Sequence, residues 1–99
     1  CGNTTALLEL MADSGADIID IDHLADLRTA VDKIGSKALI CGNFDPVSVL
    51  LEGDTDLVKN EVRKCIEIGK ERIIISAGCE VPKFTPPENL KAVAEVLAE

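Results

Sequence analysis

The sequence contains no tryptophan or tyrosine, and two phenylalanines are its only aromatic residues. So few rings leave little on which nucleobases could stack, and 18 acidic against 10 basic residues would repel a phosphate backbone. Nucleic acid is therefore not an expected partner. No apolar run approaches the roughly 20 residues of a membrane helix, and no signal peptide is visible. A cytoplasmic protein without a membrane partner is the prediction.

Cysteine is present, but not in the patterns that define cysteine-rich folds. The four residues are widely spaced and form no Cys-x-x-Cys pair, which disfavours a disulfide scaffold, a zinc finger and a zinc ribbon. Cys41 falls in a predicted strand and Cys65 on an apolar helix face, so both are predicted to be packed thiols. Cys1 and Cys79 instead stand beside turns of small residues, where metal ligands are found.

Predicted helices and strands alternate along the chain. Apolar residues recur at helical spacing in several segments, and three short segments rich in Ile have the composition of strands. Asp45 with Pro46 predicts the start of a short helix, and Thr85 with Glu88 predicts a capping box. The expected helices cover residues 5–14, 24–34, 46–51, 54–69 and 85–97, and the expected strands cover 17–22, 37–41 and 72–76.

The predicted strands have continuous apolar centres, as in Ile73-Ile74-Ile75. Such strands are typical of a parallel sheet that is buried on both faces. The alternation therefore predicts an α/β fold, either an open doubly wound sheet or a (β/α) barrel. Three strands complete neither architecture and the first residue is not methionine, so residues 1–99 are expected to be one segment of a larger domain. Its sheet edges would then be exposed and could allow self-association.

Polar and small residues cluster where the predicted strands end, which is where α/β proteins bind ligands. Asp22 at the end of the first strand could orient a substrate or cap the helix from Leu24. His23 is expected at the surface or in a local cap, and Asp45 is expected to cap its helix. The whole group is Cys1, Asn3, Asp20, Asp22, His23, Gly42, Asn43, Asp45, Gly78 and Cys79.

Several phrases of the sequence resemble the uroporphyrinogen decarboxylase superfamily. They are Cys1-Gly2-Asn3-Thr4, Gly42-Asn43-Phe44-Asp45-Pro46, Gly78-Cys79-Glu80-Val81-Pro82 and Thr85-Pro86-Pro87-Glu88-Asn89-Leu90. The order and separation of these phrases also resemble the C-terminal part of that family. The resemblance implies the C-terminal segment of a (β/α)8 TIM barrel. The two cysteines resemble the methylcobamide:coenzyme M methyltransferase branch rather than the decarboxylases.

In that branch, a His-x-Cys pair and a later Cys bind zinc. Cys1 matches the Cys of the pair and Cys79 the later Cys, whereas the paired His would precede residue 1 and is absent from this chain. The resemblance implies methyl transfer from a methylated corrinoid protein to a small thiol such as coenzyme M. A free thiol has a pKa of about 8.5 and is mostly protonated at neutral pH. Binding to zinc would remove this proton and give the thiolate of the substrate. Asp22 and Asn43 are the predicted substrate-binding residues.

Two alternatives remain open. One is a decarboxylase of a tetrapyrrole, whose acidic substrate would call for basic residues that this segment does not supply at its strand ends. The other is a stand-alone, non-catalytic α/β interaction module. In a flat sheet, Cys1 and Cys79 would lie about 14 Å apart, across three strand spacings. A zinc site cannot span that distance, so the 99 residues alone are expected to be inactive and to bind zinc weakly.

Overall fold

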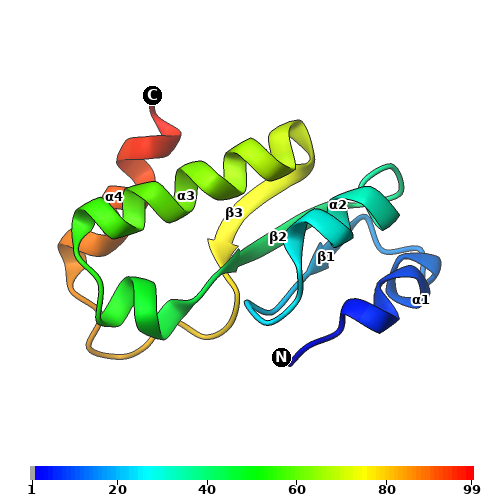
Figure 1. The fold of residues 1–99 in the computed structure, drawn as a ribbon, viewed down its shortest axis with the longest axis horizontal. Coiled ribbons are helices and arrows are strands. Elements are labelled where there is room, and N and C mark those ends of the chain that lie inside the picture. The colour runs from blue at the N-terminus through cyan, green and yellow to red at the C-terminus, as the bar shows by residue number, and fades with distance from the viewer. Residues whose placement is uncertain (1) are drawn as a thin grey trace.

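The computed structural model describes residues 2–99 as a three-stranded parallel sheet with helices packed on one face (Figure 1). The strands follow the chain in the order β1-β2-β3, and each pairs with the strand before it. The elements are η1 (Thr5–Leu7), α1 (Leu8–Asp13), β1 (Ile18–Asp20), α2 (Leu27–Ile34), β2 (Leu39–Phe44), η2 (Pro46–Leu51), α3 (Thr55–Gly69), η3 (Lys70–Arg72), β3 (Ile73–Ala77) and α4 (Pro87–Leu97).

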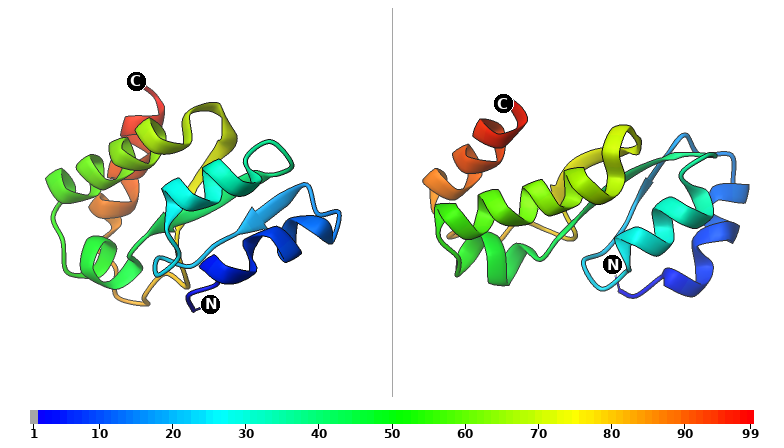
Figure 2. Two further views of the ribbon diagram at one scale, coloured as in Figure 1. Left: turned by 45° about the vertical axis from the view of Figure 1, so that its right-hand side comes forward. Right: turned by 45° about the horizontal axis from the view of Figure 1, so that its top comes forward.

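Helices α2 and α3 bury their apolar stripes against the sheet, and α4 packs against α3 (Figure 2). Val58, Val62 and Cys65 recur along the buried side of α3 at the three- and four-residue spacing that a helical face requires. Ile19 and Ile40 point from β1 and β2 into the same core, and both are buried. The core therefore lies between the sheet and this layer of helices.

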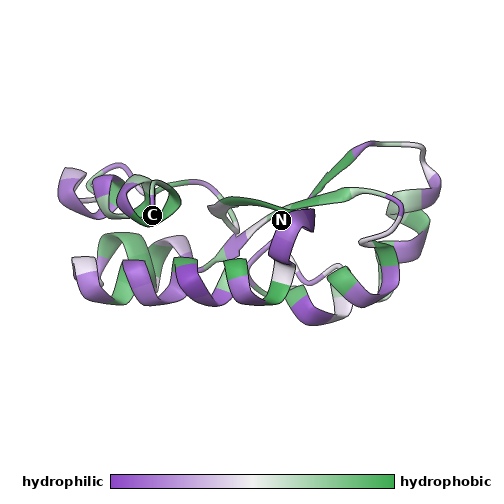
Figure 3. Ribbon diagram, turned by 90° about the horizontal axis from the view of Figure 1, so that it is seen from above, coloured by the Kyte–Doolittle hydropathy of each residue, from purple (hydrophilic) through white to green (hydrophobic). Residues whose placement is uncertain are grey.

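The opposite face of the sheet carries no helix among residues 2–99 (Figure 3). Ile18 and Ile74 lie on this face with 51% and 38% of their surface exposed. Asp20 and Cys41 are paired across β1 and β2 on the same face, and Ile74 lies opposite Cys41 on β3. One side of the sheet is thus uncovered and mixes apolar and polar groups.

Several predicted helix starts are confirmed. Asp45 accepts hydrogen bonds from the backbone N–H of Val47 and Ser48 and caps η2, whose first residue is Pro46. Asp54 accepts from Leu57 N and caps α3, which ends at Gly69 as expected. These carboxylates satisfy N–H groups that have no partner within the helix.

Several boundaries and one helix cap differ from the sequence-based expectation. Strand β2 continues through Gly42 and Asn43 to Phe44, because its ladder with β3 extends to the pair Phe44–Ala77. Helix α2 begins at Leu27 and is capped by Asp26, not by Asp22. The predicted capping box of Thr85 and Glu88 is wrong. Pro86 occupies the N-cap position of α4, and no side chain donates or accepts a capping hydrogen bond there.

The predicted α/β class, with a parallel sheet and short strands, is confirmed. Residues 2–99 form three strands, as expected for a part of a (β/α) barrel. None of the helices formed by the described residues is long and apolar enough to span a membrane.

Candidate functional site

The segments that follow the three strands meet at one residue, Gly78. Gly78 N donates to Phe44 O at 2.8 Å, and Gly78 O accepts from His23 N at 3.0 Å. The ends of β2 and β1 are thereby tied to the segment after β3. A Cβ atom at position 78 would lie 2.2 Å from His23 N, so the approach is possible only for glycine.

Asp22 is the buried carboxylate of this region. Its oxygens accept from Leu24 N at 2.9 Å and from Gly2 N at 2.8 Å, which fastens the start of the described chain to the end of β1. The Leu24 and Gly2 N–H groups hold the pKa of Asp22 below its ordinary value, although burial opposes them. Asp22 is therefore a fixed negative charge at neutral pH.

A polar cavity of about 390 Å³ opens at the carboxyl ends of β1 and β3. Its lining includes the carboxylates Asp20, Asp22 and Glu80 together with Cys79 and Ser76, and no lysine or arginine of residues 2–99 lines it. Cys79 is half-buried in its wall. The cavity thus combines a thiol with oxygen ligands, a donor set suited to a cation such as zinc.

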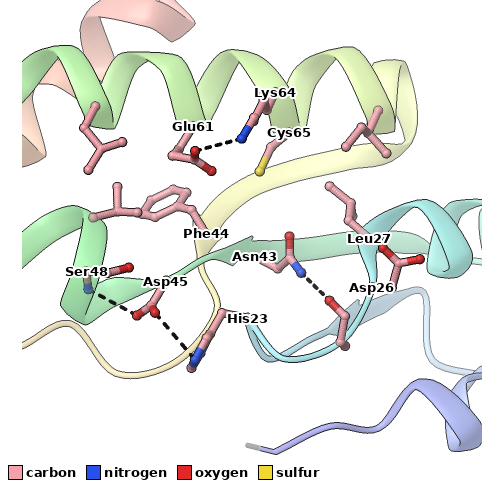
Figure 4. Close-up of a pocket in the computed structure, with 14 residues that line it drawn as sticks. His23, Asp26, Leu27, Asn43, Phe44, Asp45, Ser48, Glu61, Lys64 and Cys65 are labelled. Atoms are coloured by element: carbon pink, nitrogen blue, oxygen red, sulfur yellow. Dashed lines mark hydrogen bonds and ion pairs between the residues drawn. The ribbon is translucent and has the colours of Figure 1, made fainter. Parts of the chain in front are cut away.

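His23 lies between the carboxylates of Asp22 and Asp45, and Figure 4 shows its contact with Asp45. Its Nε2 atom is 3.7 Å from Asp45 Oδ2. Its Nδ1 atom is 3.1 Å from Asp22 Oδ1, a distance typical of an ion pair, but the two atoms are not aligned for a hydrogen bond. The predicted local role of His23 agrees with this position, since it links the segments after β1 and β2.

A larger hollow of about 530 Å³ lies between α3 and the segments after β1 and β2 (Figure 4). The polar side chains that line it are already paired: Asp45 with two backbone N–H groups, Glu61 with Lys64 at 3.1 Å, and Asp26 with Thr29. Burial raises the pKa of the Cys65 thiol at its floor, so this thiol stays protonated. The hollow is therefore better explained by packing between elements than by a ligand.

Asn43 reaches from β2 into the wall of this hollow. Its Nδ2 atom donates to Ala25 O at 2.7 Å and, at a longer 3.4 Å, to Asp22 O. These bonds tie β2 to the turn before α2. The predicted binding of substrate by Asn43 stays a prediction, and the structure adds this structural role.

Of the two predicted zinc ligands, Cys79 lies in the polar cavity and Cys1 lies outside the described residues. Gly2, the next residue, is bonded to Asp22 in the wall of the same cavity. The segments after β1 and β3 touch across the end of β2 through the bond from His23 N to Gly78 O, and the separation expected between Cys1 and Cys79 stays a prediction. Within residues 2–99, no three His, Cys, Asp or Glu side chains are clustered as a metal site.

Cys41 and Cys65 are both predicted to be packed thiols, but the two side chains differ in burial. Cys65 is buried on α3, as expected. Cys41 is half-buried on the uncovered face of the sheet, and burial raises the pKa of its thiol. Neither thiol lines the polar cavity.

Sequence reasoning missed two structural residues. The sequence predicts that Gly78 lies at a strand end but not its contact with His23, which is long-range and leaves no local pattern. Asn89 is 2% exposed on α4 and donates to the carbonyls of Leu50 and Gly53. A polar residue in line with the apolar stripe of Ala92 and Val96 is the signal that could have indicated a buried hydrogen-bonding role.

Comparison with known proteins gives a consistent result. The family model described as Uroporphyrinogen decarboxylase (URO-D) matches residues 1–99. The chain is 36% identical over 95 residues to methylcobamide:CoM methyltransferase MtbA of Methanosarcina acetivorans, covering 96% of this chain and 27% of that protein. It is 32% identical over 94 residues to MtaA, of the same description, from Methanosarcina barkeri, covering 94% and 27%.

A solved methyltransferase structure from Methanosarcina mazei superposes with a TM-score of 0.88 at 30% identity. The match covers 97% of this chain and 28% of that one. The chain thus spans about a quarter of the length of the proteins it matches. The predicted fold class, a part of a (β/α)8 barrel, is confirmed by this superposition.

Proposed function

Because the chain belongs to the uroporphyrinogen decarboxylase family, we propose that it is one segment of a methyltransferase within that family. The longer protein would move a methyl group from a methylated corrinoid, carried on a protein, to a small thiol such as coenzyme M. The likeness to two methylcobamide:CoM methyltransferases supports this activity over the other activities considered.

The observation that carries the proposal is the convergence at the strand ends. Gly78 holds the segment with Cys79 against His23, and Asp22 accepts a hydrogen bond from Gly2 N, so Cys79 and Gly2 both lie at one polar cavity. In α/β barrels, chemistry takes place at this end of the strands. Among residues 2–99, the segments that enter the opposite strand ends, 14–17, 35–38 and 70–72, contain no thiol.

The residues present fit a zinc ion, because thiols and carboxylates are ligands that zinc prefers, and the buried Asp22 could serve as a ligand partner. Cys79 and Cys1 would hold the metal, together with a histidine that precedes this chain. Bound zinc would supply a low pKa for the substrate thiol and so keep its sulfur as thiolate. Asp22, already fixed as an anion, would orient groups at the cavity wall, and Asn43 would contribute to substrate binding.

The proposed reaction balances without a further reactant. The carbon–cobalt bond of the donor breaks with both electrons remaining on cobalt. A lone pair of the thiolate forms the new sulfur–carbon bond, and the thiol proton passes to solvent. The chain's own task is to hold the thiol beside the donor and to exclude water.

The test is methyl transfer by the longer protein that contains this chain. Cys79→Ser should lower the rate at least 100-fold and lower bound zinc, measured by elemental analysis, while Cys65→Ala should preserve both. Retention of full activity and zinc by Cys79→Ser would contradict the proposal. The isolated 99 residues should be inactive and bind zinc weakly, so tight, stoichiometric uptake that Cys79→Ser removes would contradict that part.

The decarboxylase alternative is less well supported. An acidic tetrapyrrole calls for basic residues, whereas the polar cavity is lined by three carboxylates and by no lysine or arginine. The non-catalytic module is tested by the same experiment, since it predicts no methyl transfer by the longer protein.

A further inference from the structure

The wall of the polar cavity that holds Cys79 carries charge of one sign. Asp20 and Asp22 line the cavity at the end of β1, and Glu80 lines it from the segment after β3. No lysine or arginine of residues 2–99 belongs to the same lining. The side of the cavity that these residues supply is therefore negative.

The charge of Asp22 is fixed by the backbone around it. Its carboxylate accepts hydrogen bonds from Leu24 N and Gly2 N, and these bonds hold its pKa below the ordinary value. His23 also faces Asp22, with Nδ1 3.1 Å from Oδ1, but His23 does not line the cavity. Asp22 therefore presents a negative charge to the cavity at neutral pH.

The basic side chains at the two ends of β3 do not reach the cavity. Lys83 follows Glu80 by three residues, but its Nζ atom lies over the ring of Phe84, 5.5 Å from the ring centroid. Arg72, at the other end of β3, donates to Gly35 O. Neither side chain lines the cavity, so among residues 2–99 its carboxylates have no basic neighbour in the wall.

The hydrogen-bonding capacity of the wall has the same bias. Ionised carboxylates only accept hydrogen bonds. The hydroxyl of Ser76 already donates to Ala77 O at 3.2 Å, and Gly78 N already donates to a carbonyl of β2. A sulfonate or carboxylate, which can only accept, finds few partners on such a wall. An ammonium group, which has three donors and no acceptor, finds several.

The proposed function brings the acceptor thiol into this cavity, because its sulfur must lie at the site that includes Cys79. A volume of about 390 Å³ keeps the other end of a two-carbon thiol near the carboxylates. A zinc ion held by two thiolates would be neutral as a unit, so it would not cancel their charge. The body of the substrate therefore experiences a negative wall.

We propose, on the basis of the proposed function, that the thiol acceptor carries a positively charged amino group and that Asp20 and Glu80 select it against anionic thiols. This inference narrows the class of small thiols, and it disfavours an acceptor that ends in a sulfonate, as coenzyme M does. Attraction to the correct charge and repulsion of the wrong one together give such selectivity.

The test is the binding of three methylated products to the longer protein that contains this chain, measured by titration calorimetry. The S-methyl derivatives of 2-aminoethanethiol, 2-mercaptoethanol and 2-mercaptoethanesulfonate share a two-carbon body and differ in charge at one end. The dissociation constant should be at least about tenfold lower for the amine than for the sulfonate, with the alcohol between them. Salt at about 1 M should reduce this difference, because the charges of Asp20 and Glu80 are exposed to solvent.

Variants connect the preference to named carboxylates. Glu80→Gln preserves the size of the side chain and removes its charge, so the ratio of the amine and sulfonate constants should change about threefold towards one. Asp20→Asn should have an effect of the same direction and size. Glu71→Gln, an exposed position in η3 at the opposite end of β3, is the matched control and should leave the ratio unchanged.

The outcomes separate the two proposals. Equal or tighter binding of the sulfonate product would overturn the charge preference, and so would a ratio that neither Glu80→Gln nor Asp20→Asn changes more than Glu71→Gln does. The unmodified protein is also assayed for methyl transfer from the corrinoid protein to the three thiols. Absence of transfer to all three would overturn the proposed function, while the order of binding still decides the charge preference of the cavity.

Discussion

At the scale of single residues, Gly78 shapes the site because its backbone contacts the segments after two other strands. The contacts use both its N–H and its carbonyl. Both are backbone hydrogen bonds, and the close approach is possible only because residue 78 has no side chain. The position of Cys79 is therefore set by the residue before it.

Gly78→Ala should lower the free energy of unfolding by about 2–3 kcal/mol, since a new methyl group inserted against fixed atoms costs this much. The methyl would meet backbone atoms, His23 N at 2.2 Å and Asn43 O at 2.8 Å, that cannot turn aside. Urea unfolding measures the change.

Gly15→Ala is the control for that substitution. Gly15 has a φ of +87° but no atom within 4 Å of an added Cβ, so only the backbone term of about 1 kcal/mol applies. Equal costs at the two positions would show that the close approach at Gly78 is unimportant.

At the scale of elements, the buried side-chain amide of Asn89 joins α4 to the rest of the fold. Asn89 Nδ2 donates to Leu50 O at 2.8 Å and Gly53 O at 2.9 Å, which joins α4 to the turn between η2 and α3. Asn89→Ala should cost about 2–3 kcal/mol of unfolding free energy, because two carbonyls lose their donor in a buried place. Glu88→Ala, at an exposed neighbouring position, should change stability by less than about 0.5 kcal/mol.

The cap of α2 gives the fold a dependence on pH. The hydroxyl of Thr29 lowers the pKa of Asp26, and the Thr29 N–H assists while burial opposes. A lowered carboxyl pKa stabilises the fold above the ordinary value of 3.8, and this contribution is lost as pH falls through the lowered pKa. Unfolding free energies measured from pH 6 to pH 2.5 should therefore fall less steeply in Asp26→Asn. Parallel curves would contradict the role of this cap.

At the scale of the whole molecule, the one-sided sheet is the main feature. Helices bury one face, while Ile18 and Ile74 remain exposed on the other and β1 and β3 have open edges among the described residues. Open strand edges and apolar faces favour association between copies. The segment alone is thus expected to form oligomers.

Light scattering of residues 1–99 should give a mass above that of one chain at micromolar concentration. Ile18→Lys with Ile74→Lys should raise the dissociation constant at least tenfold, because two charges would be buried at the contact. Leu97→Lys, on α4, should leave it unchanged. A strictly monomeric unmodified segment would contradict the expectation.

The sequence was sufficient for features that are coded locally. Helix caps such as Asp45 and Asp54 depend on residues two or three positions away, and the βα alternation depends on short apolar patterns. The end of β2 was predicted too early, because Phe44 stays in the strand through its pairing with Ala77. The hydrogen bonds of Gly78 and Asn89 join residues more than 30 positions apart, which no local pattern encodes.

The order β1-β2-β3 also determines how the molecule can form. Each strand pairs with the one synthesised just before it, so the sheet can grow in step with the emerging chain and needs no long loop to close. Ile40 can pair with Ile19 before Ile73 is available for pairing. The walls of the polar cavity therefore come together only after β3 has formed, when Gly78 bonds to the segments that follow β1 and β2.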